Sequence, residues 1–360
     1  MKNNNNLIRR KSKVVKIGNI AIGGSFPIAV QSMTNTDSRD IGATLAQVRA
    51  LTDAGCDIVR IAAPDESAAE TFAALKREGV TIPLVADVHF DYRIALACIK
   101  AGADKIRINP GNIGQEHKIK MVAAACRAAG VPIRIGVNSG SLEKHILEKY
   151  GAPTGEALAE SALFHVSLLE KAGFDDIVVS IKASTVAATV EANRILAARC
   201  DYPLHLGVTE AGGVRMGQIK SAVGIGSLLC DGIGDTIRVS LTADPICEVE
   251  AARDILAALE LDARGAIQIV ACPTCGRTRI NLIELLSRFE EAVDKAGLRG
   301  KNVKVALMGC VVNGPGEARE ADIGVAGGAG EAVLFKHGVV VGKIPEDCII
   351  DRLIKEIKEL

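Results

Sequence analysis

The stretch ATLAQVRALTDAGCDIVRIA, residues 43–62, decides the fold, because it joins a helix to a strand through one glycine. Residues 43–54 have the apolar spacing of an amphipathic helix, and Gly55 stands where the end of a helix favours glycine. The strand DIVRIA follows at 57–62. A second helical segment, ESAAETFAALKREG at 66–79, again ends on glycine. Helices that alternate with strands in this way predict a sheet of parallel strands.

The same alternation extends over the first 260 residues or so. Eight short runs rich in β-branched residues have the character of strands, at 28–33, 57–62, 83–90, 104–112, 132–141, 176–184, 203–212 and 235–242. Eight strands, each followed by a helix, are the number that closes a TIM barrel, and the length agrees with the roughly 250 residues usual for that fold. An open doubly wound sheet is the alternative. No G-x-G-x-x-G follows the first strand, where a dinucleotide site would need it, so the barrel is favoured.

Two further segments complete the expected architecture. VVKIGNIAIGG, residues 14–24, has the pattern of a hairpin, which we expect to plug the lower end of the barrel. After about residue 262 the pattern changes to a strand, a helix, a second strand, a long loop at 311–333, a hairpin around KHG and a final helix. We therefore predict a TIM barrel at 1–262, followed by a smaller α+β domain at 263–360 with its own core.

The composition indicates which kinds of partner and which cellular compartment to expect. The chain has 43 basic and 43 acidic residues, so its neutral balance gives no indication of a nucleic-acid partner or of an anionic membrane. The basic N-terminus lacks the apolar segment of a signal peptide. No apolar run reaches the roughly 20 residues needed to span a bilayer. We expect a cytoplasmic protein.

The expected barrel strands carry polar side chains at their C-terminal ends, which is where TIM barrels place their chemistry. In strand order these are Gln31 and Ser32; Arg60; Asp87 and His89; Arg107 and Asn109; Arg134 and Asn138; Lys182 and Ser184; His205 and Glu210; and Arg238 and Ser240. Five of the strands contribute a Lys or Arg. Some of these cations are expected to pair with Asp87 or Glu210 inside the barrel. Five around one mouth, however, indicate a polyanionic ligand such as a phosphate ester or diphosphate. Asp87 and Glu210 are then the acid–base candidates.

The ten cysteines fall into two groups. Seven are scattered among apolar residues and are expected to be buried, reduced thiols: Cys56, Cys98, Cys126, Cys200, Cys230, Cys247 and Cys348. The other three lie in loops of Gly, Pro and polar residues: Cys272 and Cys275 in ACPTCGR, 271–277, and Cys310 in MGCVVNGPGE, 308–317. Each of these two loops follows an expected strand, so parallel pairing of those strands would bring the three thiols together.

Three thiols at such a place are compatible with an iron–sulfur cluster, a zinc site or a redox dithiol. No His lies in these loops to complete a zinc site, and a dithiol would leave Cys310 unexplained. A cluster is held by thiolates that follow turns, and Glu317 is the nearest anionic candidate for a fourth ligand. The spacing favours the cluster and leaves the other two open.

The motifs together resemble a known family. ACPTCGRT, MGCVVNGPGE, VQSMTNTDSRD, IRINPGN, IRIGVNSGSL, VTEAG and DGIGDTIRVSL are similar, in order and spacing, to those of 4-hydroxy-3-methylbut-2-en-1-yl diphosphate synthases in their two-domain bacterial form. The resemblance covers nearly the whole chain. It implies an oxidoreductase of isoprenoid biosynthesis, which opens and dehydroxylates 2-C-methyl-D-erythritol 2,4-cyclodiphosphate with two electrons. Reduced flavodoxin or ferredoxin would supply these electrons through a [4Fe–4S] cluster, one at a time.

The resemblance also implies roles for individual residues. The cluster ligands would be Cys272, Cys275, Cys310 and Glu317. The diphosphate would be bound by Arg60, Arg107, Arg134, Asn138, Lys182, Arg238 and Ser240. Glu210 would protonate the leaving oxygen, with Asp87 and Asn313 near the substrate. The family is homodimeric, with the cluster domain of one subunit closing over the barrel of its partner.

Two other functions stay open on the residues alone. A transferase of the pteroate-synthase kind also has a barrel for a phosphate-bearing substrate, but it would have no use for the three cysteines. A redox sensor would use the cluster as its signal and the barrel as a ligand-binding module. The colour of protein purified without oxygen separates a brown cluster protein from a colourless zinc or dithiol protein.

Overall fold

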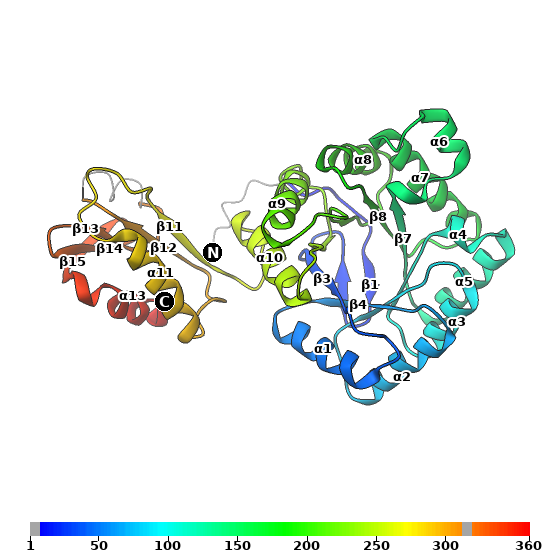
Figure 1. Cartoon of the computed structure of the whole chain (residues 1–360), viewed down its shortest axis with the longest axis horizontal. Coiled ribbons are helices and arrows are strands. Elements are labelled where there is room, and N and C mark those ends of the chain that lie inside the picture. The colour runs from blue at the N-terminus through cyan, green and yellow to red at the C-terminus, as the bar shows by residue number, and fades with distance from the viewer. Residues whose placement is uncertain (1–7, 312–318) are drawn as a thin grey trace. The chain divides into compact units, whose positions relative to one another are not determined.

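The structure is a computed structural model, which describes residues 8–311 and 319–360. The chain divides into two compact units, Met1–Leu261 and Asp262–Leu360, and each has its own hydrophobic core (Figure 1). No helix of the described residues is long and apolar enough to cross a membrane.

The first unit is built on a ring of parallel strands. They are β3 (Ala29–Met33), β4 (Ile58–Ala62), β5 (Leu84–Asp87), β6 (Lys105–Ile108), β7 (Ile133–Asn138), β8 (Ile177–Lys182), β9 (His205–Leu206) and β10 (Thr236–Ile237). They pair in the order β8-β7-β6-β5-β4-β3-β10-β9. An isolated parallel bridge between Val179 and Leu204 brings β8 beside β9, so the ring is nearly closed. The predicted TIM barrel is confirmed.

Helices follow the barrel strands along the chain and cover the outside of the barrel (Figure 1). They are α1 (Ile41–Asp53), α2 (Ala69–Arg77), α3 (Tyr92–Lys100), α4 (Pro110–Ile113), α5 (Glu116–Ala129), α6 (Lys144–Tyr150), α7 (Gly155–Lys171), α8 (Val186–Arg199), α9 (Val214–Cys230) and α10 (Pro245–Ala258), with short 3-10 turns η1 (Glu66–Ala68) and η2 (Ser139–Ser141). Several begin at a side-chain cap; Asp40 and Thr185, for example, accept from Ala43 N and Ala188 N.

The two-residue period of the strands separates the helix-facing core from the barrel interior. On β4, Val59 and Ile61 belong to the large core beneath the helices, whereas Ile58 belongs to a smaller cluster at the bottom of the barrel. Arg60 has the same parity as Ile58 and therefore faces the interior. This alternation turns every second residue of each strand toward the barrel axis.

A hairpin closes the N-terminal end of the barrel. Strands β1 (Val15–Ile17) and β2 (Ile20–Ile22) pair antiparallel. Their buried side chains cluster with residues at or near the starts of the barrel strands, among them Ala29, Ile58 and Val178. The predicted plug is confirmed, and it leaves the C-terminal ends of the strands as the end of the barrel with the polar side chains.

In its described residues, 262–311 and 319–360, the second unit is a mixed sheet with two α-helices. Its strands are β11 (Ile267–Ala271), β12 (Val303–Met308), β13 (Ile323–Gly327), β14 (Glu331–Lys336) and β15 (Val339–Pro345), paired in that order. The first three are mutually parallel and the last three antiparallel. Helices α11 (Leu282–Lys295) and α13 (Ile349–Glu359) share one core with the sheet, and η3 (Glu346–Cys348) precedes α13.

The sequence did not predict β13, which lies within the segment 311–333 that we expected to be a loop. Its residues IGVAG have little of the bulk typical of strands. Pairing with β12 on one side and β14 on the other overrides this weak local preference. Phe335 of β14 packs over Gly324, where a Cβ would lie 2.5 Å from its ring. A small residue is therefore required at position 324. Because small residues are not typical of strands, the residue types of β13 do not indicate a strand.

The scattered cysteines are only partly as expected. Cys56, Cys98 and Cys126 are buried, and burial raises the pKa of their thiols. The prediction is wrong for Cys230 and Cys348, which are exposed near the ends of α9 and η3. None of the ten forms a disulfide within the described chain.

Candidate functional site

Five cationic side chains occupy inward positions along the barrel strands or just after one, from Arg134, the second residue of β7, to Lys182 at the end of β8. They are Arg60 on β4, Arg107 on β6, Arg134 on β7, Lys182 on β8 and Arg238 just after β10. Arg107, Arg134 and Lys182 are less than a tenth exposed. The structure thus brings the five predicted cations to one mouth, and we call this set the cationic mouth.

Asp87, at the end of β5, lies between two of these cations. Its carboxylate is 3.0 Å from Arg107 Nη1 and 3.6 Å from Arg60 Nε. Burial raises the pKa of the carboxyl, but Arg60, Arg107 and Arg134 together outweigh burial and hold the pKa well below its usual range. Asp87 is therefore an ionised counter-charge at neutral pH.

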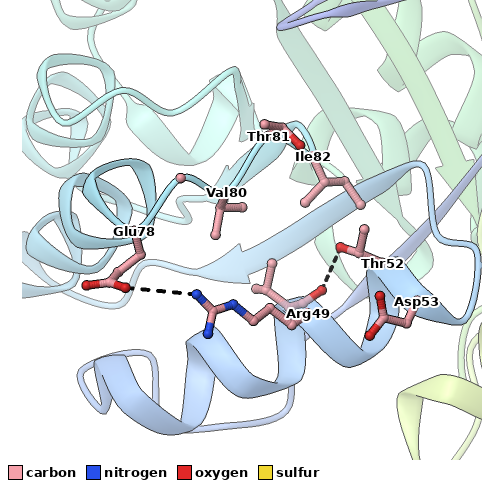
Figure 2. Close-up of a pocket in the computed structure, with 9 residues that line it drawn as sticks. Arg49, Thr52, Asp53, Glu78, Val80, Thr81 and Ile82 are labelled. Atoms are coloured by element: carbon pink, nitrogen blue, oxygen red, sulfur yellow. Dashed lines mark hydrogen bonds and ion pairs between the residues drawn. The ribbon is translucent and has the colours of Figure 1, made fainter.

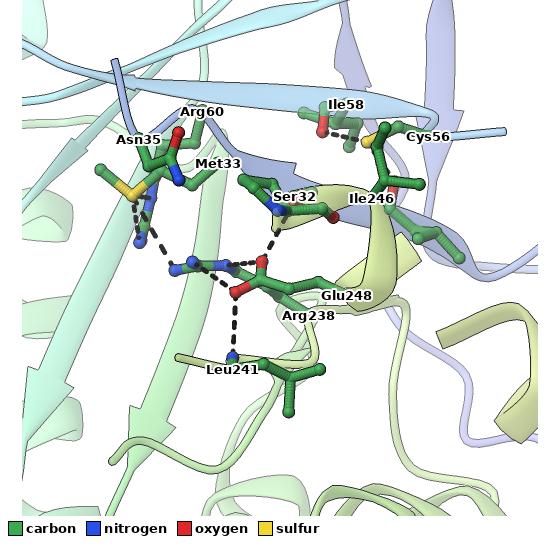
Figure 3. Close-up of polar contacts among 12 residues, drawn as sticks. Ser32, Met33, Asn35, Cys56, Ile58, Arg60, Arg238, Leu241, Ile246 and Glu248 are labelled. Atoms are coloured by element: carbon green, nitrogen blue, oxygen red, sulfur yellow. Dashed lines mark hydrogen bonds and ion pairs between the residues drawn. The ribbon is translucent and has the colours of Figure 1, made fainter. Parts of the chain in front are cut away.

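Glu248, on the buried face of α10, balances Arg238 in the same way. Its carboxylate accepts from Arg238 Nε at 3.2 Å and Nη2 at 3.3 Å, and also from Ser32 Oγ and the Leu241 N–H (Figure 3). The sequence analysis missed Glu248. A signal was present, because it is a charged residue at a helix position otherwise surrounded by buried Pro245, Val249 and Ala252.

The carboxylates of Asp87 and Glu248 do not neutralise the five charges of the cationic mouth. Burial, with Asp87 partly opposing it, lowers the pKa of Arg60 to about 10. Burial and the neighbouring cations lower the pKa values of Arg134 and Lys182 well below their usual ranges. A buried excess of positive charge is unfavourable on its own, so the arrangement favours a ligand with several negative charges.

Glycines at two inward positions make room for these long side chains. A Cβ on Gly136 of β7 would lie 2.4 Å from Arg107 Nε, and one on Gly207, just after β9, would lie 2.7 Å from Lys182 Nζ. Arg107 therefore extends across β7, and Lys182 across the end of β9, through the space that a side chain on the glycine would fill. Neither glycine was recognised as part of the site from the sequence.

A deeper polar layer lies below the mouth. Lys105 stands two residues before Arg107 on β6, is fully buried, and its Nζ has no hydrogen-bond partner among the described residues. Gln31 and His205 are also buried in this layer, with His205 Nδ1 2.7 Å from Thr236 Oγ1. Burial and the nearby cations lower the pKa of His205, which favours a neutral imidazole.

The other predicted barrel residues lie at the rim. Glu210 follows β9 and is exposed, with φ of 52°, a left-handed conformation that is unusual for a residue other than glycine. Such conformations persist where the surrounding structure holds them, often at functional sites. Asn138 ends β7 opposite Lys182 in the register, and Ser240 is half-buried in the loop after β10. His89 is more than half exposed beside Asp87.

The cysteine loops follow two neighbouring strands of the second unit. β11 pairs with β12 in parallel, as predicted, so Cys272 and Cys310 follow adjacent strand ends. The Gly309 N–H donates to Cys272 Sγ at 3.3 Å, and the Arg279 N–H donates to the Gly309 carbonyl at 2.8 Å. These contacts hold the loop that carries Cys272 and Cys275 against the residue that precedes Cys310.

The thiols suit an iron–sulfur cluster in donor type, and the loops that carry them follow adjacent strands. The backbone N–H and side chain of Arg277 lower the pKa of the exposed Cys275 thiol, which favours the thiolate. Gly309 also lacks a side chain where a Cβ would lie 2.8 Å from Thr278 Cγ2, so the two loops approach closely. Within residues 8–311 and 319–360, no three His, Cys, Asp or Glu side chains form a group that could hold a metal ion. The predicted ligand Glu317 and the predicted site residue Asn313 lie outside the described residues.

Comparison with known proteins covers both units. Residues 12–253 match the family model described as the GcpE TIM-barrel domain, and residues 268–359 match the GcpE protein C-terminal domain. A curated protein from Ruminiclostridium cellulolyticum, named 4-hydroxy-3-methylbut-2-en-1-yl diphosphate synthase (flavodoxin), is 56% identical over 98% of both chains. One of the same name from Geobacter sulfurreducens is 55% identical over 98% of this chain and 99% of its own.

The chain belongs to the 4-hydroxy-3-methylbut-2-en-1-yl diphosphate synthase family. The resemblance stated from the motifs is thereby confirmed, and membership makes the chain an oxidoreductase. Among solved structures, dihydropteroate synthase from Xanthomonas albilineans is similar over 70% of this chain and 100% of that chain, with 15% identity and a TM-score of 0.49. A likeness of that size carries no argument about function.

A separate pocket of about 320 Å³ lies between α1 and the end of α2 (Figure 2). Its lining includes Arg49 and Glu78, whose charged groups are 3.9 Å apart, and the segment 79–82 that leads into β5. These residues stand before the barrel strands rather than after them. The pocket therefore lies away from the C-terminal strand ends, where TIM barrels carry their chemistry.

Proposed function

We propose that the protein converts 2-C-methyl-D-erythritol 2,4-cyclodiphosphate to 4-hydroxy-3-methylbut-2-enyl diphosphate, with reduced flavodoxin as the electron donor. Two electrons and two protons enter, the ring C–O bond breaks, and one hydroxyl leaves as water. The observation that carries the proposal is the cationic mouth, in which three buried and two partly buried cations face only the two carboxylates of Asp87 and Glu248. The names of the relatives supply the product and the donor.

In this proposal the cationic mouth binds the diphosphate. Arginines suit phosphate oxygens because they form bidentate hydrogen bonds, and the buried site strengthens each of these bonds. Asn138 and Ser240 at the rim add neutral donors. When the ring opens, negative charge concentrates on the phosphate oxygen that leaves carbon, and the fixed cations stabilise that charge without having to reorganise.

Glu210 and Asp87 have two different roles in this proposal. Glu210 is exposed at the rim and supplies the proton to the leaving hydroxyl oxygen. Asp87 is ionised and engaged by Arg60 and Arg107, so it orients these two cations beside the substrate. Asn313 is assigned to the neighbourhood of the substrate on the family pattern alone.

Cys272, Cys275, Cys310 and Glu317 would hold a [4Fe–4S] cluster, which supplies single electrons when bound. The two loops with cysteines bring thiolate donors to adjacent strand ends, as such a cluster requires. We assign the reaction to the cytoplasm, where reducing conditions keep these thiols free.

The decisive test combines colour with turnover. Protein purified anaerobically should be brown, and Glu210→Gln should keep that colour but lose turnover of the cyclic diphosphate with dithionite and a viologen dye. Glu260→Gln is the matched control, because Glu260 also has a left-handed backbone, with φ of 56°, but lies after α10. Colourless protein would refute the cluster, and full activity of Glu210→Gln would remove Glu210 from the mechanism.

We further propose that the protein works as a homodimer, in which the cluster domain of one subunit serves the barrel of the other. Mixing tests this arrangement directly. Glu210→Gln and Cys310→Ser should each be inactive, whereas dimers assembled from both should regain activity, since one barrel and one cluster domain remain intact across the pair. Failure of mixed dimers to regain activity would show that each subunit serves itself.

A further inference from the structure

We infer that Glu248 is a positioning residue, which fixes the guanidinium of Arg238 in the cationic mouth and so sets the direction from which a diphosphate is bound. The inference deepens the proposed function and rests on it in one respect, namely that Arg238 binds the diphosphate. Glu248 itself touches no substrate in this view and acts through Arg238.

Both oxygens of the Glu248 carboxylate are used. Oε2 accepts from Ser32 Oγ at 3.0 Å and from Arg238 Nε at 3.2 Å. Oε1 accepts from the Leu241 N–H at 3.0 Å and from Arg238 Nη2 at 3.3 Å. One side chain of α10 therefore ties together β3, the end of β10 and the loop that follows β10 (Figure 3).

The burial of Glu248 shows that this arrangement is specific. Only 4% of the residue is exposed, on a helix face that otherwise packs apolar side chains against the barrel. A carboxylate at such a position is strongly disfavoured unless donors surround it. The four donors meet that condition, and two of them come from Arg238.

The ion pair between Glu248 and Arg238 leaves one edge of the Arg238 guanidinium available for a ligand. Nε and Nη2 face Glu248, so the Nη1 group points away from the carboxylate, toward the Met33 sulfur at 3.9 Å. The same sulfur is approached by Arg60 Nη2 at 2.9 Å and Nε at 3.1 Å (Figure 3). Because a thioether is a weak acceptor, it cannot neutralise two guanidinium groups. Glu248 is what holds Arg238 beside Arg60 despite their repulsion.

Two roles for Glu248 predict opposite effects of removing its charge. If Glu248 were only a counter-charge, its neutralisation would make the mouth more positive and tighten the binding of a polyanion. If Glu248 positions Arg238, its neutralisation releases the guanidinium, and binding weakens. The sign of the change therefore distinguishes the two roles.

The experiment measures the binding of inorganic pyrophosphate to the full-length protein by calorimetry. Glu248→Gln should weaken binding about tenfold, the loss expected when one charge-assisted hydrogen bond from Arg238 to the ligand is disturbed. Glu250→Gln, on the exposed face of the same helix, makes the same change in charge and should bind as the unsubstituted protein does. Arg238→Lys should also weaken binding, and the double variant should be no weaker than Arg238→Lys, because both changes disable one unit.

Glu248→Asp is the second variant, since it keeps the charge but withdraws it by one methylene. Positioning predicts weaker binding for this variant too, whereas a pure counter-charge predicts unchanged binding. Unchanged or tighter binding by Glu248→Gln, or additive losses in the double variant, would overturn the inference. Pyrophosphate binding needs no turnover, so inactivity of the unsubstituted protein toward the cyclic diphosphate would refute the proposed function without deciding this test.

Discussion

Arg107 occupies the space that a side chain at position 136 would need: a Cβ on Gly136 would lie 2.4 Å from Arg107 Nε and 2.7 Å from Nη2. Contacts that short do not occur, so one of the two groups must move. The guanidinium is the far end of a flexible side chain, and it is also the group that pairs with Asp87 at 3.0 Å. The glycine on β7 thus determines where a cation from β6 stands.

Gly136→Ala should therefore displace Arg107 rather than unfold the barrel. We expect binding of pyrophosphate to weaken by about tenfold, because a charge-assisted contact worth roughly 1.5 kcal/mol is disturbed. Calorimetry gives the affinity, and thermal unfolding reports on the fold. Gly226→Ala on α9 is the control, since its Cβ would meet nothing within 4 Å. Unchanged affinity in Gly136→Ala would show that Arg107 does not need this position.

Lys182 should make binding depend on pH. Burial first, and then Arg238 and Arg60, lower the pKa of its ammonium well below the usual range. A bound polyanion adds opposite charge and raises that pKa, so binding takes up a proton. Since the bound form holds the proton more tightly, affinity should fall as pH rises through the interval between the two pKa values.

The number of protons taken up is measurable from the heat of pyrophosphate binding in buffers that differ in ionisation enthalpy. Lys182→Arg keeps its charge across this pH range and should reduce the uptake and flatten the pH dependence of affinity. Equal uptake by both proteins would assign the proton to another group.

Lys105 should lower the stability of the protein without a ligand. Its Nζ is buried and has no partner among the described residues, and Arg134 and Arg60 add to the effect of burial in lowering its pKa. Lys105→Met keeps the length of the side chain and removes the polar end, so we expect a gain of about 1–3 kcal/mol in the free energy of unfolding. Binding of pyrophosphate should weaken at the same time, because the potential in the mouth falls.

Thermal unfolding and calorimetry on one preparation test both halves of that expectation. Lys100→Met at the exposed end of α3 is the control and should change neither quantity much. A lower melting temperature for Lys105→Met would mean that the lysine is paired through groups other than those described.

The sequence was sufficient to predict the barrel and its cations, because both follow from short periods. Strands that alternate with glycine-capped helices predict the ring, and Arg60 or Arg134 stands out as a charge within an apolar strand. The same period of two places Lys105 on the face of Arg107, so this residue was predictable but was overlooked.

Other parts of the site depend on contacts between segments far apart in the chain. Glu248 is 216 residues from Ser32, and its role is apparent only once α10 packs against β3. Gly136 and Gly207 matter because of side chains on neighbouring strands, which no local pattern displays. The strand β13 likewise owes its existence to partners on both sides rather than to its own residues.

Gly309 provides a test of the cysteine site that does not touch a cysteine. A Cβ at this position would lie 2.8 Å from Thr278 Cγ2 and 3.1 Å from its Oγ1, and the Gly309 N–H donates to Cys272 Sγ. Gly309→Ala should therefore push the CPTC loop away from the end of β12 and separate Cys272 and Cys275 from Cys310. We expect lower iron and sulfide content after anaerobic reconstitution, with a matching loss of visible absorption.

Gly276→Ala is the control. It lies within the same loop, where a Cβ meets nothing within 4 Å, and should retain both the iron and sulfide content and the absorption. Because pyrophosphate binding belongs to the barrel, it should be equal in the two variants. Full iron content in Gly309→Ala would mean that the close approach of the two loops is not what gathers the ligands.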